Sequence, residues 1–244
     1  MIRAVSLLSA LLACATLHAQ EATPSPSAAP PSPQAILRAF TALGLPQEKE
    51  TYSVTYKQGA TEGVLFDHVR GCARSGFGTS GLELPPGHYE FTVRRDGAGA
   101  GHTVRAELKD GASYFLFAVL QQGRPVLGLE QESPVPEDGG GIYIYNLLPE
   151  PRLGVSVGGQ PSGVPFALTP TVLSPDSVAG QPVALVYPSR RKSLLTRPVD
   201  YAGTGRVTAV FLRNEASQPS VLLFTAPAAT PAPAAATAQP GGTR

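Results

Sequence analysis

The sequence predicts an all-β protein made of two tandem antiparallel Ig-like β-sandwiches. Its 26 glycines and 25 prolines disfavour helices, because glycine leaves the backbone unrestrained and proline removes a helix hydrogen bond. A hydrophobic fraction of 42% is enough for packed cores and excludes disorder along the whole chain. Short runs of β-branched and aromatic residues recur between turn residues, a pattern typical of sandwiches.

Residues 1–19 are expected to be a signal peptide. Arg3 precedes a run of small and apolar residues, Ala4–Ala13, that is shorter than the roughly 20 residues needed to span a bilayer. Cleavage after Ala19 would place a small residue at the last position of the signal. The sequence therefore predicts a periplasmic or extracellular protein.

Cys14 gives this segment a second interpretation. Leu11-Leu12-Ala13-Cys14 resembles a bacterial lipobox, in which the cysteine is lipidated and anchors the protein to a membrane. Alternatively, Cys14 is a small residue that is removed with the signal peptide. Cys72 is then the last cysteine of the chain, so no intrachain disulfide can form, and the state of the Cys72 thiol stays open.

The net charge narrows the classes of partner. Removal of Arg3 with the signal peptide leaves 18 basic and 18 acidic residues. A neutral chain lacks the basic excess that attracts nucleic acids or an anionic membrane surface. We expect no nucleic-acid binding, and membrane contact only through an anchor at Cys14.

Both ends of the mature chain have biased compositions. Proline, serine and alanine dominate residues 20–33, and proline and alanine dominate residues 226–244. Such segments stay extended and bury too little apolar surface to fold. We expect a linker before the folded part and a disordered tail after it.

Residues 34–45 are expected to form a short amphipathic helix. Ser32 could cap it, Pro33 suits its first turn and Gly44 suits its end. Its apolar stripe would contain Ile36, Leu37, Phe40 and Leu43. Phe40 would either dock on the folded body or enter the groove of a partner.

The first sandwich is predicted over residues 50–135. Turn residues such as Pro85-Pro86-Gly87 and Asp110-Gly111 separate its expected strands. These strands are residues 52–56, 63–66, 88–93, 103–108 and 114–120.

The second sandwich is predicted over residues 141–225, because the pattern of the first recurs there. Residues 52–56 match 142–146, residues 115–120 match 207–212, and residues 124–127 match 218–223. The glycine-rich stretch 136–141 is the expected hinge between the two domains.

Two segments carry a family resemblance. Leu84–Val93 and Leu108–Val119 fit the motifs L-P-x-G-x-Y-x-x-x-V and L-x-x-G-x-x-Y-x-x-x-A-V. The chain thereby resembles a family of exported bacterial tandem β-sandwich proteins of unknown function, and its layout is similar to that of the periplasmic accessory protein of alginate O-acetylation. The resemblance spans roughly residues 51–225 and implies fold and export. The second unit departs from it, with Ser174-Pro-Asp-Ser177 in place of the P-x-G-x-Y motif.

Asp67, His68 and Cys72 form the densest cluster of reactive side chains. The histidine and the cysteine could share a metal, with Asp67 as a further ligand or hydrogen-bond acceptor. The other interpretation is a solvated surface loop. No G-x-S-x-G or Walker motif occurs, and Gly76–Gly81 matches G-x-G-x-x-G without a helix predicted after it. We therefore expect no cofactor and no catalytic residues.

Arg190, Arg191 and Lys192 form the main basic cluster of the sequence. They would either make a solvated hairpin tip or bind an anionic polysaccharide or an acidic envelope protein. The favoured function is a non-catalytic, exported interaction or scaffold protein of the cell envelope, accessory to exopolysaccharide assembly or acylation. One alternative is a lipid-anchored adhesion or matrix protein. The other is a small metal-dependent enzyme that uses Asp67, His68 and Cys72.

Overall fold

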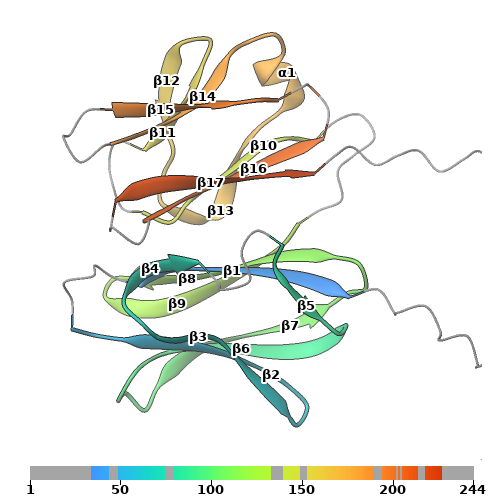
Figure 1. The fold of residues 1–244 in the computed structure, drawn as a ribbon, viewed down its shortest axis with the longest axis vertical. Coiled ribbons are helices and arrows are strands. Elements are labelled where there is room, and N and C mark those ends of the chain that lie inside the picture. Colours follow the sequence, from blue (N-terminus) through green and yellow to red (C-terminus); the bar gives the residue numbers. More distant parts are fainter. Residues whose placement is uncertain are drawn as a thin grey trace, which may run out of the picture. The chain divides into compact units, whose positions relative to one another are not determined.

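Strands account for nearly all regular structure in the computed structural model of the chain, as the sequence predicts (Figure 1). The structure describes residues 34–43, 49–74, 80–132, 140–148, 153–188, 194–201, 203, 205–213 and 218–226, without the side chains of 71–74, 188 and 194. Within these ranges there are seventeen strands and one helix of a single turn, α1 (Pro175–Val178). The predicted signal peptide and linker, Cys14, and residues 227–244 of the predicted tail lie outside the described residues, whereas Ala226, the first residue of that tail, ends β17.

The first sandwich consists of two sheets, which we name A and B. Sheet A has the order β4-β1-β8-β9, with β5 also paired to β1, and sheet B has the order β3-β2-β6-β7. The strands of sheet A are β1 (Ala35–Leu43), β4 (Gly71–Arg74), β5 (Leu82–Leu84), β8 (Ser113–Gln121) and β9 (Arg124–Glu132). The strands of sheet B are β2 (Tyr52–Gln58), β3 (Thr61–Val69), β6 (Gly87–Arg95) and β7 (Gly101–Leu108).

The second sandwich repeats this arrangement in sheets C and D. Sheet C has the order β13-β10-β16-β17, and sheet D has the order β12-β11-β14-β15. The strands of sheet C are β10 (Gly141–Asn146), β13 (Ala167–Leu173), β16 (Arg206–Arg213) and β17 (Pro219–Ala226). The strands of sheet D are β11 (Gly154–Val157), β12 (Gln160–Gly163), β14 (Val183–Pro188) and β15 (Leu194–Val199).

The expected helix at residues 34–45 is a strand, β1. It pairs parallel with β8 and antiparallel with β4 and β5, so it is a central strand of sheet A. Leu37 and Ala39 face the core shared with sheet B, whereas Phe40 faces the opposite side. Hydrogen bonds on both edges outweigh the helix propensity of alanine and leucine. The first sandwich therefore begins at Ala35 and not at residue 50.

The internal repeat is confirmed, but one of its predicted matches is wrong. Both sandwiches start with a central strand that pairs parallel with a late strand, β1 with β8 and β10 with β16. Residues 142–146 therefore correspond to β1 and not to residues 52–56. The matches of β8 with β16 and of β9 with β17 hold. Because of the two parallel pairs, sheets A and C are mixed, whereas sheets B and D are antiparallel as predicted.

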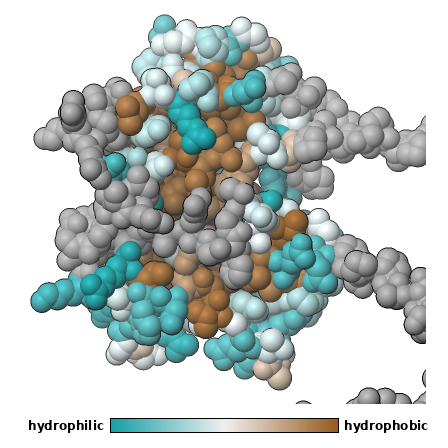
Figure 2. Space-filling view, viewed as in Figure 1, coloured by the Kyte–Doolittle hydropathy of each residue, from teal (hydrophilic) through white to brown (hydrophobic). Residues whose placement is uncertain are grey.

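Each sandwich has its own apolar core. Figure 2 shows hydrophobic atoms between the two sheets of each sandwich and hydrophilic atoms along the outer strands. The largest buried side chains of the first core include Tyr52, Tyr89 and Phe91, and those of the second include Ile142, Ile144 and Phe211.

The L-P-x-G-x-Y motif has a structural role in the first core. Gly87 has a φ of 139°, a backbone angle that residues other than glycine rarely adopt. Tyr89 is 2% exposed, and its hydroxyl lies 2.8 Å from the Pro85 carbonyl oxygen and 2.9 Å from Gln58 Oε1. In the second sandwich, α1 occupies the stretch that lacks this motif.

Sheets A and C pack against each other through a third apolar cluster. It contains Phe40, Phe115, Phe117 and Val119 of the first sandwich, and Tyr145, Leu147, Val210 and Leu212 of the second. The rings of Phe117 and Tyr145 are 4.8 Å apart between centroids, and those of Phe40 and Phe224 are 5.8 Å apart. Such pairs add about 0.5–1.5 kcal/mol each beyond the burial of their area. The two sandwiches therefore belong to one compact unit.

Proline within the described sheets concentrates on edge strands. The edge strands β9, β12, β13, β15 and β17 contain Pro125, Pro161, Pro170, Pro198 and Pro219. Among the inner strands, β14 alone contains a proline, Pro188, at its last residue. Proline cannot donate a ladder hydrogen bond, so it blunts an edge against pairing with another chain.

Candidate functional site

A β-bulge in the β2–β3 hairpin positions His68. Two residues of β3, Asp67 and His68, oppose the single residue Ser53 of β2. His68 has a φ of 49°, which is uncommon for a residue with a side chain. At this bulge the side chains of β3 no longer alternate regularly between the two faces of the sheet. The bulge thus places the imidazole beside the end of β6 and the turn residue Asp96.

Asp96 is the centre of a polar cluster that we call the Asp96 cluster: Ser53, Asp67, His68 and Asp96. His68 Nδ1 lies 2.7 Å from Asp96 Oδ2, and the Ser53 hydroxyl donates to Asp96 Oδ1 at 2.8 Å. His68 Nε2 lies 3.5 Å from Asp67 Oδ1. The backbone N–H of His68 donates to Ser53 Oγ at 3.4 Å.

The charges in this cluster stabilise each other. The hydrogen bond to Asp96 raises the pKa of His68, and the negative charges of Asp67 and Asp96 add to this effect. Burial opposes ionisation of Asp96, but hydrogen bonds from Thr51, His68 and Ser53 outweigh it and lower the pKa of the carboxyl. An ionised pair of His68 and Asp96 is therefore favoured in weakly acidic solution.

The Asp96 cluster contains serine, histidine and aspartate, but their order differs from that of a hydrolytic triad. In a triad the histidine accepts the serine proton and the carboxylate orients the histidine. Here Ser53 donates directly to Asp96, so its hydroxyl proton is not directed at His68. The arrangement holds the bulge against the β6–β7 turn and supplies no activated nucleophile.

The backbone of Cys72 lies in sheet A, whereas Ser53 and His68 of the Asp96 cluster lie in sheet B. The chain crosses from sheet B to sheet A between β3 and β4, and Cys72 pairs in register with Ala42 of β1. The predicted Asp67, His68 and Cys72 set is therefore divided between two sheets. Within the described ranges, no group of three or more histidine, cysteine, aspartate or glutamate residues is placed to hold a metal ion.

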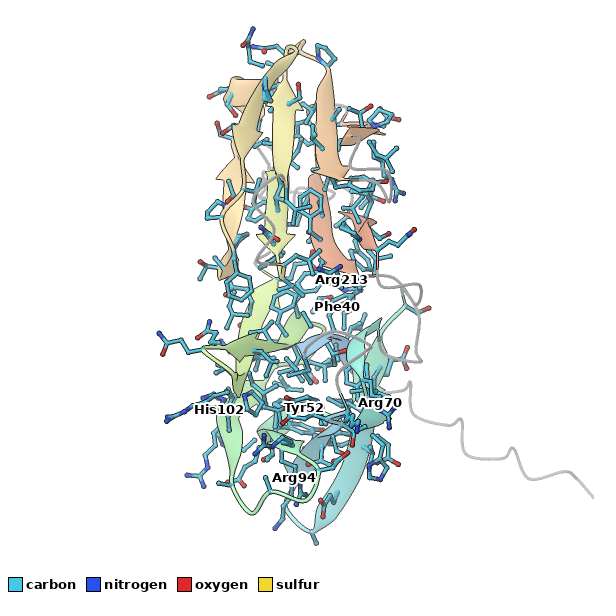
Figure 3. The ribbon with its side chains drawn as sticks, turned by 90° about the vertical axis from the view of Figure 1, so that its left-hand side faces the viewer. Phe40, Tyr52, Arg70, Arg94, His102 and Arg213 are labelled. Atoms are coloured by element: carbon cyan, nitrogen blue, oxygen red, sulfur yellow. The ribbon has the colours of Figure 1, made fainter. Side chains whose placement is uncertain are left out.

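Phe40 is not available to a partner. It is 2% exposed and lies in the cluster between sheets A and C. In Figure 3, Phe40 and Tyr52 lie on opposite sides of sheet A. The other predicted interaction residues, Arg190, Arg191 and Lys192, lie outside the described residues.

An ion pair between the two sandwiches was not anticipated from the sequence. Arg206 Nη1 of β16 lies 3.4 Å from Glu132 Oε1 of β9, and Arg38 Nη1 of β1 lies 3.5 Å from the other oxygen. The Arg206 side chain is 4% exposed, and its guanidinium carbon lies 4.0 Å from the Tyr143 ring centre. Burial raises the pKa of the neighbouring Glu130, although Arg206 opposes this shift.

In each sandwich, one side chain forms a hydrogen bond between the edge strands of its two sheets. In the first, the backbone N–H of Leu127 on β9 donates to His102 Nδ1 on β7 at 3.1 Å, and Figure 3 shows His102 at the side of the sheets. In the second, Arg197 on β15 donates to the carbonyl of Val221 on β17 at 2.8 Å. β7 and β9 correspond to β15 and β17 in the repeat. His102 thus has a structural contact that joins the edges of sheets A and B.

A groove of about 470 Å³ crosses the outer face of sheet B. Its lining residues come from β2, β6 and β7 and from Gly59, which directly follows β2. The polar side chains that line it are Lys57, His88, Glu90 and Arg105. Nothing in the sequence pattern singled them out, because each is an ordinary solvent-facing residue of an alternating strand.

Comparison with protein-family models and with curated proteins finds no match to this chain. In the described part, the one helix has four residues, too few for a helix to cross a membrane. Function is therefore inferred from the chain's own geometry.

Proposed function

We propose that the protein is an exported, non-catalytic interaction and scaffold protein of the bacterial cell envelope. The observation that carries this proposal is the joint between the two sandwiches. An aromatic cluster and the ion pair of Arg206 with Glu132 link sheet A to sheet C, so the two repeats pack into one unit that can serve as a support. Sheets B and D are left with polar outer strands for contacts with partners.

Several contacts support a non-catalytic role. Ser53, His68 and Asp96 are used to hold a bulge, and His102 and Arg197 bridge sheet edges. The role we propose for the Asp96 cluster is therefore to stabilise the fold. This interpretation keeps the metal-dependent enzyme as the competing hypothesis, since Asp67 and His68 are exposed to solvent.

Partner binding would use side-chain surfaces and not the addition of a strand. Prolines on five edge strands and the bulges of β3 disfavour pairing with an extended segment. A role beside an exopolysaccharide-assembling or acylating enzyme agrees with the resemblance of Leu84–Val93 and Leu108–Val119 to exported tandem sandwiches.

Complementation of a deletion strain tests the proposal. We expect a defect in envelope polysaccharide or its acylation that wild-type protein and His68→Ala both restore. Phe117→Ala should fail to restore it, because it opens a cavity at the joint between the sandwiches. Failure of a folded His68→Ala variant, together with bound metal in purified wild-type protein, would instead favour the enzyme.

Fractionation tests the location. A soluble periplasmic chain that begins at Gln20 would support the signal-peptide interpretation. Incorporation of a labelled lipid that is lost in Cys14→Ser would favour the anchored adhesion or matrix protein.

A further inference from the structure

We propose that the groove on sheet B binds an acidic polysaccharide through a carboxylate of the sugar chain. The inference rests on the proposed function and names the ligand class of one surface. The groove measures about 470 Å³, within the range of roughly 300–1,000 Å³ common for ligand pockets.

The register of sheet B builds the groove. Lys57 of β2 pairs with Glu90 of β6, which pairs with Arg105 of β7, so one row of charges crosses three strands. His88 stands two residues before Glu90 on the same face, opposite Glu107 of β7. Lys57, His88, Glu90 and Arg105 line the groove on this face, whereas Glu107 does not.

The residues that line the groove carry two positive charges, on Lys57 and Arg105, and one negative charge, on Glu90. Arg105 Nε donates to Glu90 Oε1 at 2.6 Å, so the one carboxylate in the lining is already paired. No described residue forms an ion pair with Lys57. Glu62 is in register with Lys57 but does not line the groove. The Lys57 ammonium and the outer N–H groups of Arg105 are therefore available to a carboxylate.

The lining favours a sugar chain over a peptide. Tyr89 and Ala106 also border the groove, but Tyr89 is 2% exposed and Ala106 is half-buried, so neither offers an aromatic or apolar anchor. Peptide-binding surfaces depend on such anchors. The neighbouring row of threonines, with Thr92 and Thr103 hydroxyls 2.9 Å apart, extends a hydrogen-bonding surface suited to sugar hydroxyls.

Titration of the full mature protein with a galacturonate oligosaccharide tests this inference. We expect binding that shifts amide signals of β2, β6 and β7, and no binding of the methyl-esterified oligosaccharide, which has no free carboxylate. Lys57→Gln should weaken binding about tenfold, because one charge-assisted contact is lost. Lys109→Gln removes an exposed lysine outside the groove and should leave the affinity unchanged.

Three results would overturn the inference. These are no binding to the wild-type protein, equal binding of acid and ester, or equal weakening by Lys57→Gln and Lys109→Gln. Thermal unfolding of both variants checks that they fold. If the oligosaccharide does not bind but complementation still depends on the joint between the sandwiches, only this ligand is excluded and the proposed function still stands.

Discussion

Asp96 shows how one carboxylate can fix two segments of the chain. It accepts hydrogen bonds from Ser53 on β2 and from His68 on the bulge of β3. A bulged edge strand would otherwise gain conformational freedom where its ladder is interrupted. The contact therefore stabilises the left-handed backbone of His68, and an ionised imidazole strengthens it.

The stability contribution of this pair should depend on pH in both directions. The hydrogen bond to Asp96 raises the pKa of His68 above its ordinary 6.5, so the stabilisation is full below pH 6.5 and is lost as pH rises through the folded-state pKa. The pKa of Asp96 is lowered from 3.8, so its contribution exists above pH 3.8 and is lost as pH falls through the folded value. Urea unfolding should therefore show the largest cost of His68→Ala between these limits.

The double variant provides the control for this pH dependence. His68→Ala and Asp96→Asn should each remove the contribution, and together they should cost less than the sum of the two. Additive effects at every pH would contradict a direct interaction between the side chains.

Gly63 should be intolerant of a side chain. It pairs in register with Tyr56, whose ring lies where a Cβ on Gly63 would stand. Gly63→Ala should displace this ring and lower the free energy of unfolding by about 1–3 kcal/mol. Gly99→Ala is the matched control, because no atom lies within 4 Å of its Cβ position. Equal stability of the two variants would show that Tyr56 moves without cost.

The sequence could not identify Asp96 as the partner of His68. Asp67 and Cys72 are close to His68 in the chain, whereas Asp96 lies 28 residues away. Asp96 comes near His68 only because β2 pairs with both β3 and β6 and because β3 has a bulge at His68. No local sequence pattern predicts that bulge. Proximity in sequence therefore could not reveal the contact between His68 and Asp96.

At the level of elements, β1 explains the main error in predicting the fold. Its apolar residues Ile36, Leu37, Phe40 and Leu43 fit a helical stripe. A strand buried on both faces can have the same pattern. Alternating strands with one solvated face, such as β6 and β7, were predictable from their period of two. Parallel pairing of β1 with β8 is a non-local feature that periodicity does not encode.

Removal of β1 distinguishes a central strand from an accessory helix. A chain that begins at Lys49 should lose cooperative unfolding, because β8 would lose its parallel partner and the first core would lose Leu37. A chain that begins at Gln34 should unfold as the full-length chain does. Thermal unfolding followed by circular dichroism measures both. A folded and cooperative chain without β1 would contradict the assignment.

At the level of the whole molecule, the joint between the sandwiches combines rings with a buried ion pair. The strand β8 is apolar on both faces because Leu116 faces sheet B while Phe117 faces sheet C. The sequence pattern predicted two sandwiches and a hinge between them, but it did not predict that sheets A and C pack against each other. The low exposure of Glu132 and Arg206 could not be predicted, because charged residues at strand ends are usually exposed to solvent.

Loss of Arg206 should destabilise the joint. Arg206→Met leaves Glu132, which is 14% exposed, with Arg38 as its remaining ionic partner, and we expect a cost of about 1–3 kcal/mol. Arg105→Met, which removes an exposed ion pair, should change stability by less than about 0.5 kcal/mol. Urea unfolding compares the two, and equal effects would mean that the Arg206 contact is not desolvated.

The parallel pairing of β1 with β8, repeated in β10 with β16, has a consequence for the order of folding. β1 comes first in the chain, yet its parallel partner β8 follows only after six further strands. Non-local pairings of this kind slow folding, because a long loop must close before they form. The Phe40 face of β1 stays uncovered until the second sandwich has formed. The full chain should therefore show a slow folding phase that ends when β16 and β17 have joined sheet C.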